Sequence, residues 1–217
     1  MKSLLLSKLS FGLFCVGVVC LVTLPIVYAQ QDTKPTYASL LEKVLKSDPT
    51  ADFAALRLAY FDNPPADRAE ADSKISQSMF AALNDKKYDK VIENAQQILN
   101  GSYVDIDAHI ALAAAYQAKK NADKEKFHAW VADGLIKSIL TSGDGKSLAT
   151  AWTVISTHEE YVILRVFGLM PGTQSLISDK GHHYDRLDAT DPQTKKQFTL
   201  YFNIDRPYGK LEKLLKQ

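Results

Sequence analysis

The chain has 217 residues, of which 46% are hydrophobic and 24% charged, so it is long enough to bury a core, and its composition excludes a wholly disordered protein. Its formal net charge is +1, and the part after residue 29 carries 24 basic against 25 acidic residues, a balance that predicts no nucleic acid partner. Both cysteines, Cys15 and Cys20, precede that point. Without its first 29 residues the chain has no disulfide, thiol nucleophile or thiolate metal site.

Residues 1–29 are predicted to be a signal peptide. Lys2 and Lys8 precede an apolar run, Pro25 ends that run, and Ala29 is a small residue at a position that signal peptidases read. We therefore expect export, with cleavage near Ala29 and a periplasmic or secreted mature protein. The run approaches the length of a membrane span, so an uncleaved anchor is the alternative, and it is the one membrane contact that the sequence predicts.

Residues 36–140 are predicted to form antiparallel helical hairpins, because apolar residues recur there at helical spacing between turn residues. The expected helices cover residues 37–45, 51–60, 73–83, 91–99, 105–116 and 127–139. The turn at Lys87-Tyr88-Asp89-Lys90 recurs as Asn121-Ala122-Asp123-Lys124, an offset of 34 residues, which is the tetratricopeptide period. We predict a tetratricopeptide-like region. A plain helical bundle is the alternative, since one repeat and a fraction is too few for a solenoid.

The sequence TSGDGKS at residues 141–147 is predicted to be a linker. Its last three residues resemble the end of a phosphate-binding loop. That motif needs a glycine five residues before Gly145, and Leu140 stands there. This departure excludes a nucleotide site of that kind.

Residues 148–217 are predicted to form an α+β region. A strand is expected near Trp152, a second at residues 175–177, and a capping box of Thr157 and Glu160 opens a helix over residues 161–167. Apolar residues lie on almost every side of that helix, so we expect it to be buried. Its one charge is Arg165, and a buried arginine requires a partner. The predicted fold class is α+β: helical hairpins followed by a small antiparallel sheet with one packed helix.

The alternating pattern within residues 181–207 predicts a β-hairpin with one apolar and one polar face. Apolar residues alternate with polar ones in its second strand, and Asp191-Pro192 opens the turn. If Thr190 faces Gln197, the apolar face pairs Ala189 with Phe198 and Leu187 with Leu200. The polar face then pairs Asp188 with Thr199, Arg186 with Tyr201, Tyr184 with Asn203, and His182 with Asp205.

Several stretches resemble a bacterial family of exported proteins, domain of unknown function 4919. They are Asp52-Phe53 with Leu56-Arg57 and Tyr60, residues 103–109 (YVDIDAH), residues 142–147 (SGDGKS), Glu159-Glu160-Tyr161, Gly181-His182 with Tyr184-Asp185, and residues 201–205 (YFNID). The resemblance implies export and a helical first half, and it implies no activity. The chain departs from the family at Lys195-Lys196, where a glycine is expected, which affects the turn type.

The polar hairpin face supplies the candidate site. With Glu160 and Arg165 of the preceding helix, its residues form the predicted binding or polar cluster: His182, Tyr184, Arg186, Tyr201, Asn203 and Asp205. The alternative is an ordinary solvated or docked sheet surface, because antiparallel sheets commonly show water one polar side. We favour this alternative.

No metal or cofactor is predicted. His182 and His183 lie on opposite faces of a strand, and His158 stands beside two glutamates at a helix start, where acidic residues are expected from the helix dipole. His109 and His128 lack the spacing of a zinc site.

Two function classes remain. We favour a non-catalytic exported interaction module that binds an exported or envelope protein or peptide, because no catalytic constellation is present and the helical faces are typical of such modules. The alternative is a hydrolase-type enzyme that uses the His182 and Asp205 neighbourhood with Glu159 or Glu160. No catalytic residue is assigned, and the sequence predicts no particular oligomeric state.

Overall fold

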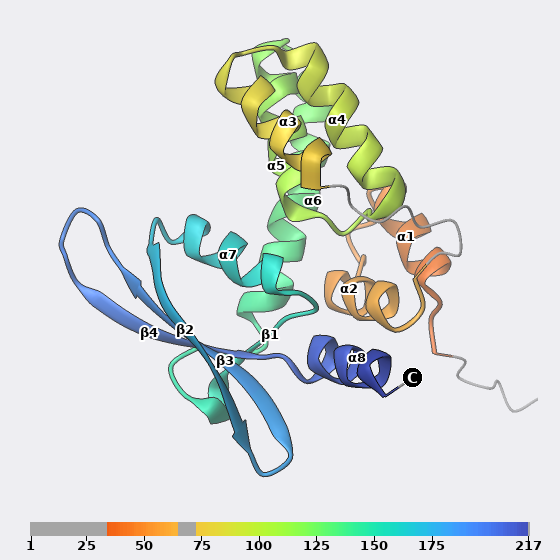
Figure 1. Cartoon of the computed structure of the whole chain (residues 1–217). Coiled ribbons are helices and arrows are strands. Elements are labelled where there is room, and N and C mark those ends of the chain that lie inside the picture. Colours follow the sequence, from red (N-terminus) through yellow and green to blue (C-terminus); the bar gives the residue numbers. More distant parts are fainter. Residues whose placement is uncertain (1–33, 65–72, 217) are drawn as a thin grey trace, which may run out of the picture. The chain divides into compact units, whose positions relative to one another are not determined.

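Two short helices open the described part of the computed structural model, which comprises residues 34–64 and 73–216 (Figure 1). Helix α1, Tyr37–Leu45, begins after Thr36, and α2, Phe53–Asp62, begins after Asp52; each preceding side chain accepts a backbone N–H of the first turn. Both helices lie within two residues of the predicted ranges. From Pro35 onward the chain forms one compact unit. The predicted signal peptide and its cleavage point lie outside the described residues.

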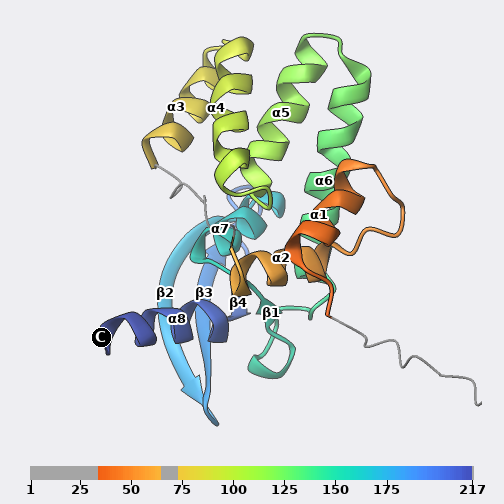
Figure 2. The same cartoon turned by 90° about the vertical axis from the view of Figure 1, so that its right-hand side faces the viewer.

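Four longer helices follow, and each packs against the next (Figure 2). They are α3 (Ser73–Asn84), α4 (Tyr88–Gly101), α5 (Ile106–Ala118) and α6 (Ala122–Leu140). Lys86 after α3 and Lys120 after α5 both adopt a left-handed conformation, with φ of 58° and 57°. The two turns therefore share a backbone geometry at the predicted offset. The tetratricopeptide assignment itself stays a prediction. No helix among the described residues combines the length and the apolar character that a membrane span requires.

The close packing of α2 on α6 depends on a glycine. A Cβ atom at Gly134 of α6 would lie 2.3 Å from the Phe53 ring, a separation that real structures do not show. The same ring packs edge-on against Trp130, with centroids 5.1 Å apart. These contacts belong to a hydrophobic core that continues from α1 and α2 through α6 to α7 and the sheet, while α3, α4 and α5 share a second core.

The sheet has four strands in the order β1-β4-β3-β2. They are β1 (Trp152–Thr153), β2 (Met170–Asp179), β3 (His182–Thr190) and β4 (Gln197–Asn203). The α+β class is confirmed. Two details were wrong: β1 pairs with β4 in parallel, so the sheet is mixed, and β2 extends well beyond the predicted residues 175–177. A two-residue strand carries no periodicity that could indicate its direction.

The predicted hairpin register is confirmed from Thr190↔Gln197 through Tyr184↔Asn203. On its apolar face Leu187, Ala189, Leu200 and Phe202 are buried in the core that includes α7. The turn between the strands is built on Asp191, which accepts the N–H groups of Gln193 and Thr194. Lys195 there has a φ of 62°, a left-handed conformation that favours the glycine expected from the family.

The predicted linker folds against the sheet. Gly145 has a φ of 68°, and a Cβ atom on it would lie 2.5 Å from the Trp152 ring, so this position requires glycine. The Trp152 indole donates to the carbonyl of Gly143 at 3.1 Å, and the N–H of Tyr201 in β4 donates to the carbonyl of Gly145 at 2.9 Å. The short helix η1, Leu148–Thr150, then leads into β1. The loop therefore covers the edge of β4 beyond the short β1.

Two further helices complete the fold. Helix α7, Thr157–Val166, is capped by Ser156 rather than by the predicted Thr157. It is also less buried than expected, because Val166 and Phe167 at its end are exposed. Helix α8, Asp205–Leu215, starts within the predicted hairpin, contacts β3 and has no buried residue. Tyr208 packs on the core, whereas Leu211, Leu214 and Leu215 are exposed.

Candidate functional site

The polar hairpin face is half-exposed and open. Arg186 contacts Asp188 Oδ1 at 2.8 Å, and the Thr199 hydroxyl donates to the same oxygen at 2.9 Å, as expected for an ordinary cross-strand network. Tyr184 is buried, while Arg186, Tyr201 and Asn203 are partly exposed. None of the predicted residues of this face lines the cleft that lies between α3 and α8.

Asp205 ties the end of the hairpin to the start of α8. Its carboxylate accepts from the N–H of His183 and from the ring of His182, both at 2.7 Å, and from the side chain of Asn203 at 3.1 Å. Partial burial pushes the pKa of Asp205 upward, but these three donors outweigh it and hold that pKa below its ordinary value. The predicted contact of His182 with Asp205 is therefore present, although Asp205 lies in a helix and not opposite His182 in a strand.

Replacing Asp205 with alanine is expected to lower the free energy of unfolding by about 1–3 kcal/mol, because the His183 N–H and the Asn203 amide lose their acceptor. Asp188→Ala is the matched control, since both carboxylates have 36% side-chain exposure. Asp188 bonds only to side chains of β3 and β4, namely Arg186 and Thr199. Urea unfolding of both variants measures the difference. Equal losses would show that Asp205 is an ordinary surface carboxylate.

Glu160 lies on the opposite side of β3 from His182. It is 0% exposed, and its neighbour Asp185 belongs to the apolar face of the hairpin. The amide of Gln174 donates to Glu160 at 3.2 Å and to Asp185 at 2.9 Å, while Glu160 Oε1 is buried without a hydrogen bond. Burial, and then the charge of Asp185, raise the pKa of Glu160 to about 9. Glu160 is therefore a neutral acid inside the protein at neutral pH.

Arg165 was expected to be buried, and this was wrong. Its side chain is 49% exposed and pairs with Asp107 of α5. His158 donates to the same carboxylate at 3.2 Å. Burial alone would raise the pKa of Asp107, but His158 and Arg165 together bring it below its ordinary value. The hydrogen bond to Asp107 raises the pKa of His158 above its ordinary value.

The buried arginine is Arg57 of α2. It is 2% exposed and forms a two-point contact with Glu159 of α7, from Nε to Oε1 at 2.8 Å and from Nη2 to Oε2 at 2.7 Å. Ser138 and the carbonyl of Thr153 accept its other N–H groups, and the N–H of Ile155 donates to Glu159. Every charged atom of the pair thus has a partner, which a buried ion pair requires.

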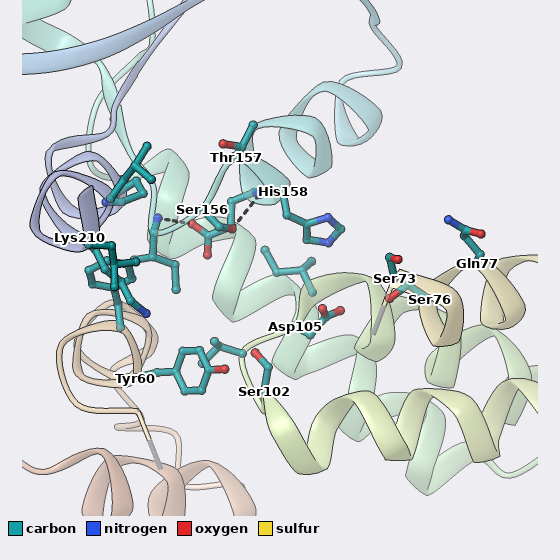
Figure 3. A pocket seen from close by; sticks show the side chains of 18 of the residues that line it. Tyr60, Ser73, Ser76, Gln77, Ser102, Asp105, Ser156, Thr157, His158 and Lys210 are labelled. Atoms are coloured by element: carbon teal, nitrogen blue, oxygen red, sulfur yellow. Dashed lines mark hydrogen bonds between the residues drawn. The ribbon is translucent and has the colours of Figure 1, made fainter. Parts of the chain in front are cut away.

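A cleft of about 760 Å³ opens beside this ion pair (Figure 3). Its floor is formed by the chain before α5 and by the start of α7, and its walls come from the end of α2, from α3 and from α8. The lining residues are Tyr60, Phe61, Ser73, Ser76, Gln77, Phe80, Ser102, Val104, Asp105, Ile106, Ile155, Ser156, Thr157, His158, Glu159, Pro207, Lys210, Leu211 and Leu214.

The floor of the cleft is mostly polar, the α8 wall is apolar except for Lys210, and the α3 wall adds Phe80 to three polar side chains. Asp105 accepts the N–H of Ala108 at 2.8 Å and caps α5. Burial raises the pKa of Asp105 above its ordinary value. In Figure 3 the side chains of His158 and Asp105 point into the space between Lys210 on one side and Gln77 on the other. The cleft can therefore receive apolar groups between its walls and a polar or anionic group at its floor.

The residues of the hydrolase alternative do not come together. Glu159 is bound by Arg57, Glu160 is buried on the far side of β3, and His182 donates to Asp205 at the exposed end of the hairpin. In the described part of the chain, no serine or threonine hydroxyl bonds to His182. The pair therefore lacks the nucleophile that a triad would need.

His109 and His128 approach each other inside the helical half, with 3.0 Å between their Nδ1 atoms. Burial lowers the pKa of His109 to about 3 and that of His128 to about 4, so both rings are neutral near pH 7. His109 Nε2 lies 2.9 Å from the carbonyl of Tyr103, which makes it the donor there. Within residues 34–64 and 73–216, no three histidine or carboxylate side chains gather to hold a metal ion.

Sequence reasoning missed Arg57, Asp105, Asp107 and His158 as neighbours of one cleft. The available signal was the family resemblance, because three of its stretches meet here: the α2 motif with Arg57, residues 103–109, and Glu159-Glu160-Tyr161. The spacing of these three stretches along the chain does not indicate that they lie close together in the fold.

The fold and the cleft define an α+β protein with an open, partly apolar cleft. The chain belongs to the family described as Domain of unknown function (DUF4919), whose model matches residues 28–213. A search of curated proteins and a search of solved structures find no match.

Proposed function

We propose that this chain is an exported, non-catalytic binding protein whose cleft receives a peptide segment of another exported or envelope protein. The observation that carries the proposal is the exposure of large apolar side chains on the two facing walls. Phe80 of α3 is 38% exposed, and Leu211 and Leu214 of α8 are 53% and 60% exposed. Covering each such side chain contributes about 1.5–3 kcal/mol at full burial, so two or three of them can hold a peptide.

The cleft is large enough to hold several side chains of one bound peptide. Its volume of about 760 Å³ lies in the range of small-molecule and peptide pockets. The apolar stripe of α8, with Phe80 of α3 opposite, resembles the grooves that bind amphipathic segments through side chains at regular spacing.

The charges at the cleft favour an acidic partner. Lys210 lines the cleft, and the hydrogen bond to Asp107 raises the pKa of His158 at the floor, which favours the cationic form of this ring. Arg165 offsets the charge of Asp107, and burial raises the pKa of Asp105. The segment that fits best therefore carries leucine or phenylalanine side chains next to carboxylates.

Export in this proposal rests on the predicted signal peptide at residues 1–29. A partner that reaches the cleft would accordingly be an exported or envelope protein. The proposal needs no catalytic residue and no cofactor.

The test uses protein purified from the exported fraction of cells that express the full chain. The fluorescent dye anilinonaphthalene sulfonate combines an apolar body with an anionic group, and we expect it to bind at one saturable site. Leu214→Asp and Phe80→Asp each place a charge on a wall and should weaken dye binding about tenfold or more. Leu45→Asp alters an equally exposed leucine outside the cleft and should have no effect.

Competition then identifies the class of ligand. Short acetylated peptides of alternating leucine and glutamate should displace the dye, and peptides with lysine in place of glutamate should not. Absence of saturable dye binding would contradict the binding site. Dye binding that neither peptide displaces would contradict the peptide as its ligand.

A further inference from the structure

Strand β2 forms one edge of the sheet and lies open along its length. It pairs with β3 on one side, and no strand lies on its other side within the described residues (Figure 1). The strand is ten residues long, and its residues from Met170 to Gln174, with Leu176 and Ser178, are exposed. Open edges of this kind present unpaired backbone groups to other chains.

The opposite edge of the same sheet is protected. Strand β1 has two residues, and beyond it the N–H of Tyr201 in β4 donates to the carbonyl of Gly145 in the loop before η1. A short strand and a covering loop are two ways in which proteins block an edge. The fold therefore closes one edge with a dedicated loop and leaves β2 uncovered.

The backbone of β2 offers hydrogen bonds in a regular array. His183 in β3 uses both of its backbone groups away from β2, since its N–H donates to Asp205 and its carbonyl accepts from Ile204. Its cross-strand partner Ser178 therefore also directs its N–H and C=O away from β3, because antiparallel pairs alternate in this way. The same alternation applies to Leu176 opposite Asp185 and to Gln174 opposite Leu187.

The usual protection against strand addition is confined to the two ends of β2, the second of which carries the charged Asp179. Pro171 and the register shift between Pro171 and Gln174 disturb the beginning of the strand. Residues 174–178 are regular and carry no charge, and Leu176 at their centre is 53% exposed. This five-residue stretch has the features of an edge that accepts a partner strand.

We propose that β2 pairs with the β2 strand of a second copy of this chain, antiparallel and about a twofold axis at Leu176. Gln174 then faces Ser178 of the other copy, Leu176 faces Leu176, and the three outward residues of each strand exchange about six hydrogen bonds. The pairing places no like charges opposite each other, and it buries the two exposed leucines side by side. The two sheets become one sheet of eight strands, independently of what the cleft binds.

Proline at position 176 provides the test, because the N–H of Leu176 points outward. Leu176→Pro removes a donor from the new pairing and leaves the bonds between β2 and β3 intact. Leu176→Ala removes the same side chain and keeps the donor. Sedimentation of the exported protein should give a dimer for the natural chain and for Leu176→Ala. Leu176→Pro should associate at least about a hundredfold more weakly while its melting remains cooperative.

A second measurement covers the case in which Leu176→Pro does not fold. The exported chain is predicted to be free of cysteine, so Leu176→Cys should form a disulfide between two copies on mild oxidation. Leu45→Cys is the control, because Leu45 is 55% exposed and Leu176 is 53% exposed. A natural chain that stays monomeric overturns the proposal and leaves the edge to a strand of another protein. Equal cross-linking at the two positions, or a dimer unaffected by Leu176→Pro, overturns it as well.

Discussion

Glu159→Ala is expected to lower the free energy of unfolding by about 3–5 kcal/mol, one of the two largest effects that we predict. The substitution leaves the Arg57 guanidinium without its carboxylate at a position where Arg57 is 2% exposed. An unpaired buried charge has no water to replace its partner, and the cost falls in this range when one member of a buried ion pair is removed. Urea or thermal unfolding at neutral pH measures the loss.

The reciprocal substitution and the double substitution distinguish the ion pair from simple packing. Arg57→Ala should cost a similar amount, because Glu159 is 4% exposed and would be left as an unpaired anion. The double variant Arg57→Met with Glu159→Met removes both charges and keeps much of the volume, so it should be far more stable than either single variant. Additive losses in the double variant would show that the two side chains do not act as a pair.

This ion pair also positions the cleft. Glu159 and Tyr60 both line it, and Arg57 connects α2 to α7 across 102 residues of sequence. Tyr60 donates to the carbonyl of Gly101 at 3.0 Å, which fixes the end of α2 against the end of α4. A folded variant without the ion pair should therefore lose dye binding together with stability, whereas Leu214→Asp should lose dye binding alone.

The parts of the fold that could be predicted are those coded by local periodicity. Alternation in residues 197–203 determined which residue of β3 faces which residue of β4, since a slip of one residue would have exposed Leu200 and Phe202. The same reasoning failed at Asp205, because the chain leaves the strand there and the side chain reaches back to His182 and His183. In an alternating pattern, the first residue of a helix that follows a strand looks like one more residue of that strand.

The cleft could not be predicted, because tertiary contacts decide which of two similar residues is buried. Arg57 and Arg165 each stand alone among apolar residues of a helix, yet Arg57 is buried and Arg165 is half-exposed. The cap of α7 shows the same effect. Glu159 accepts from Arg57 and from the N–H of Ile155, which places Ser156, and not Thr157, at the cap position. Sequence spacing alone allowed either choice.

The second large effect concerns Glu160, whose buried carboxyl has a pKa of about 9 against an ordinary value of 4.5. Because the folded pKa lies above the unfolded one, the stability that this group contributes is fully present below pH 4.5 and is lost as pH rises toward 9. Each pH unit in that window costs up to about 1.4 kcal/mol. The loss begins near the ordinary pKa, because there the unfolded chain releases a proton that the folded chain retains.

Glu160→Gln should therefore become more stable than the natural chain as pH rises, by several kcal/mol at pH 8 on the scale of about 1.4 kcal/mol per pH unit. Glutamine has nearly the same shape, cannot ionise, and can accept from Gln174 while it donates to Asp185. The measurement is the difference in unfolding free energy between the two proteins from pH 5 to pH 9. Glu93→Gln, on the exposed side of α4, should leave the pH profile unchanged. Parallel profiles for the natural chain and Glu160→Gln would mean that Glu160 is ionised in the folded protein, and that Asp185 and Gln174 accommodate a buried anion beside β3.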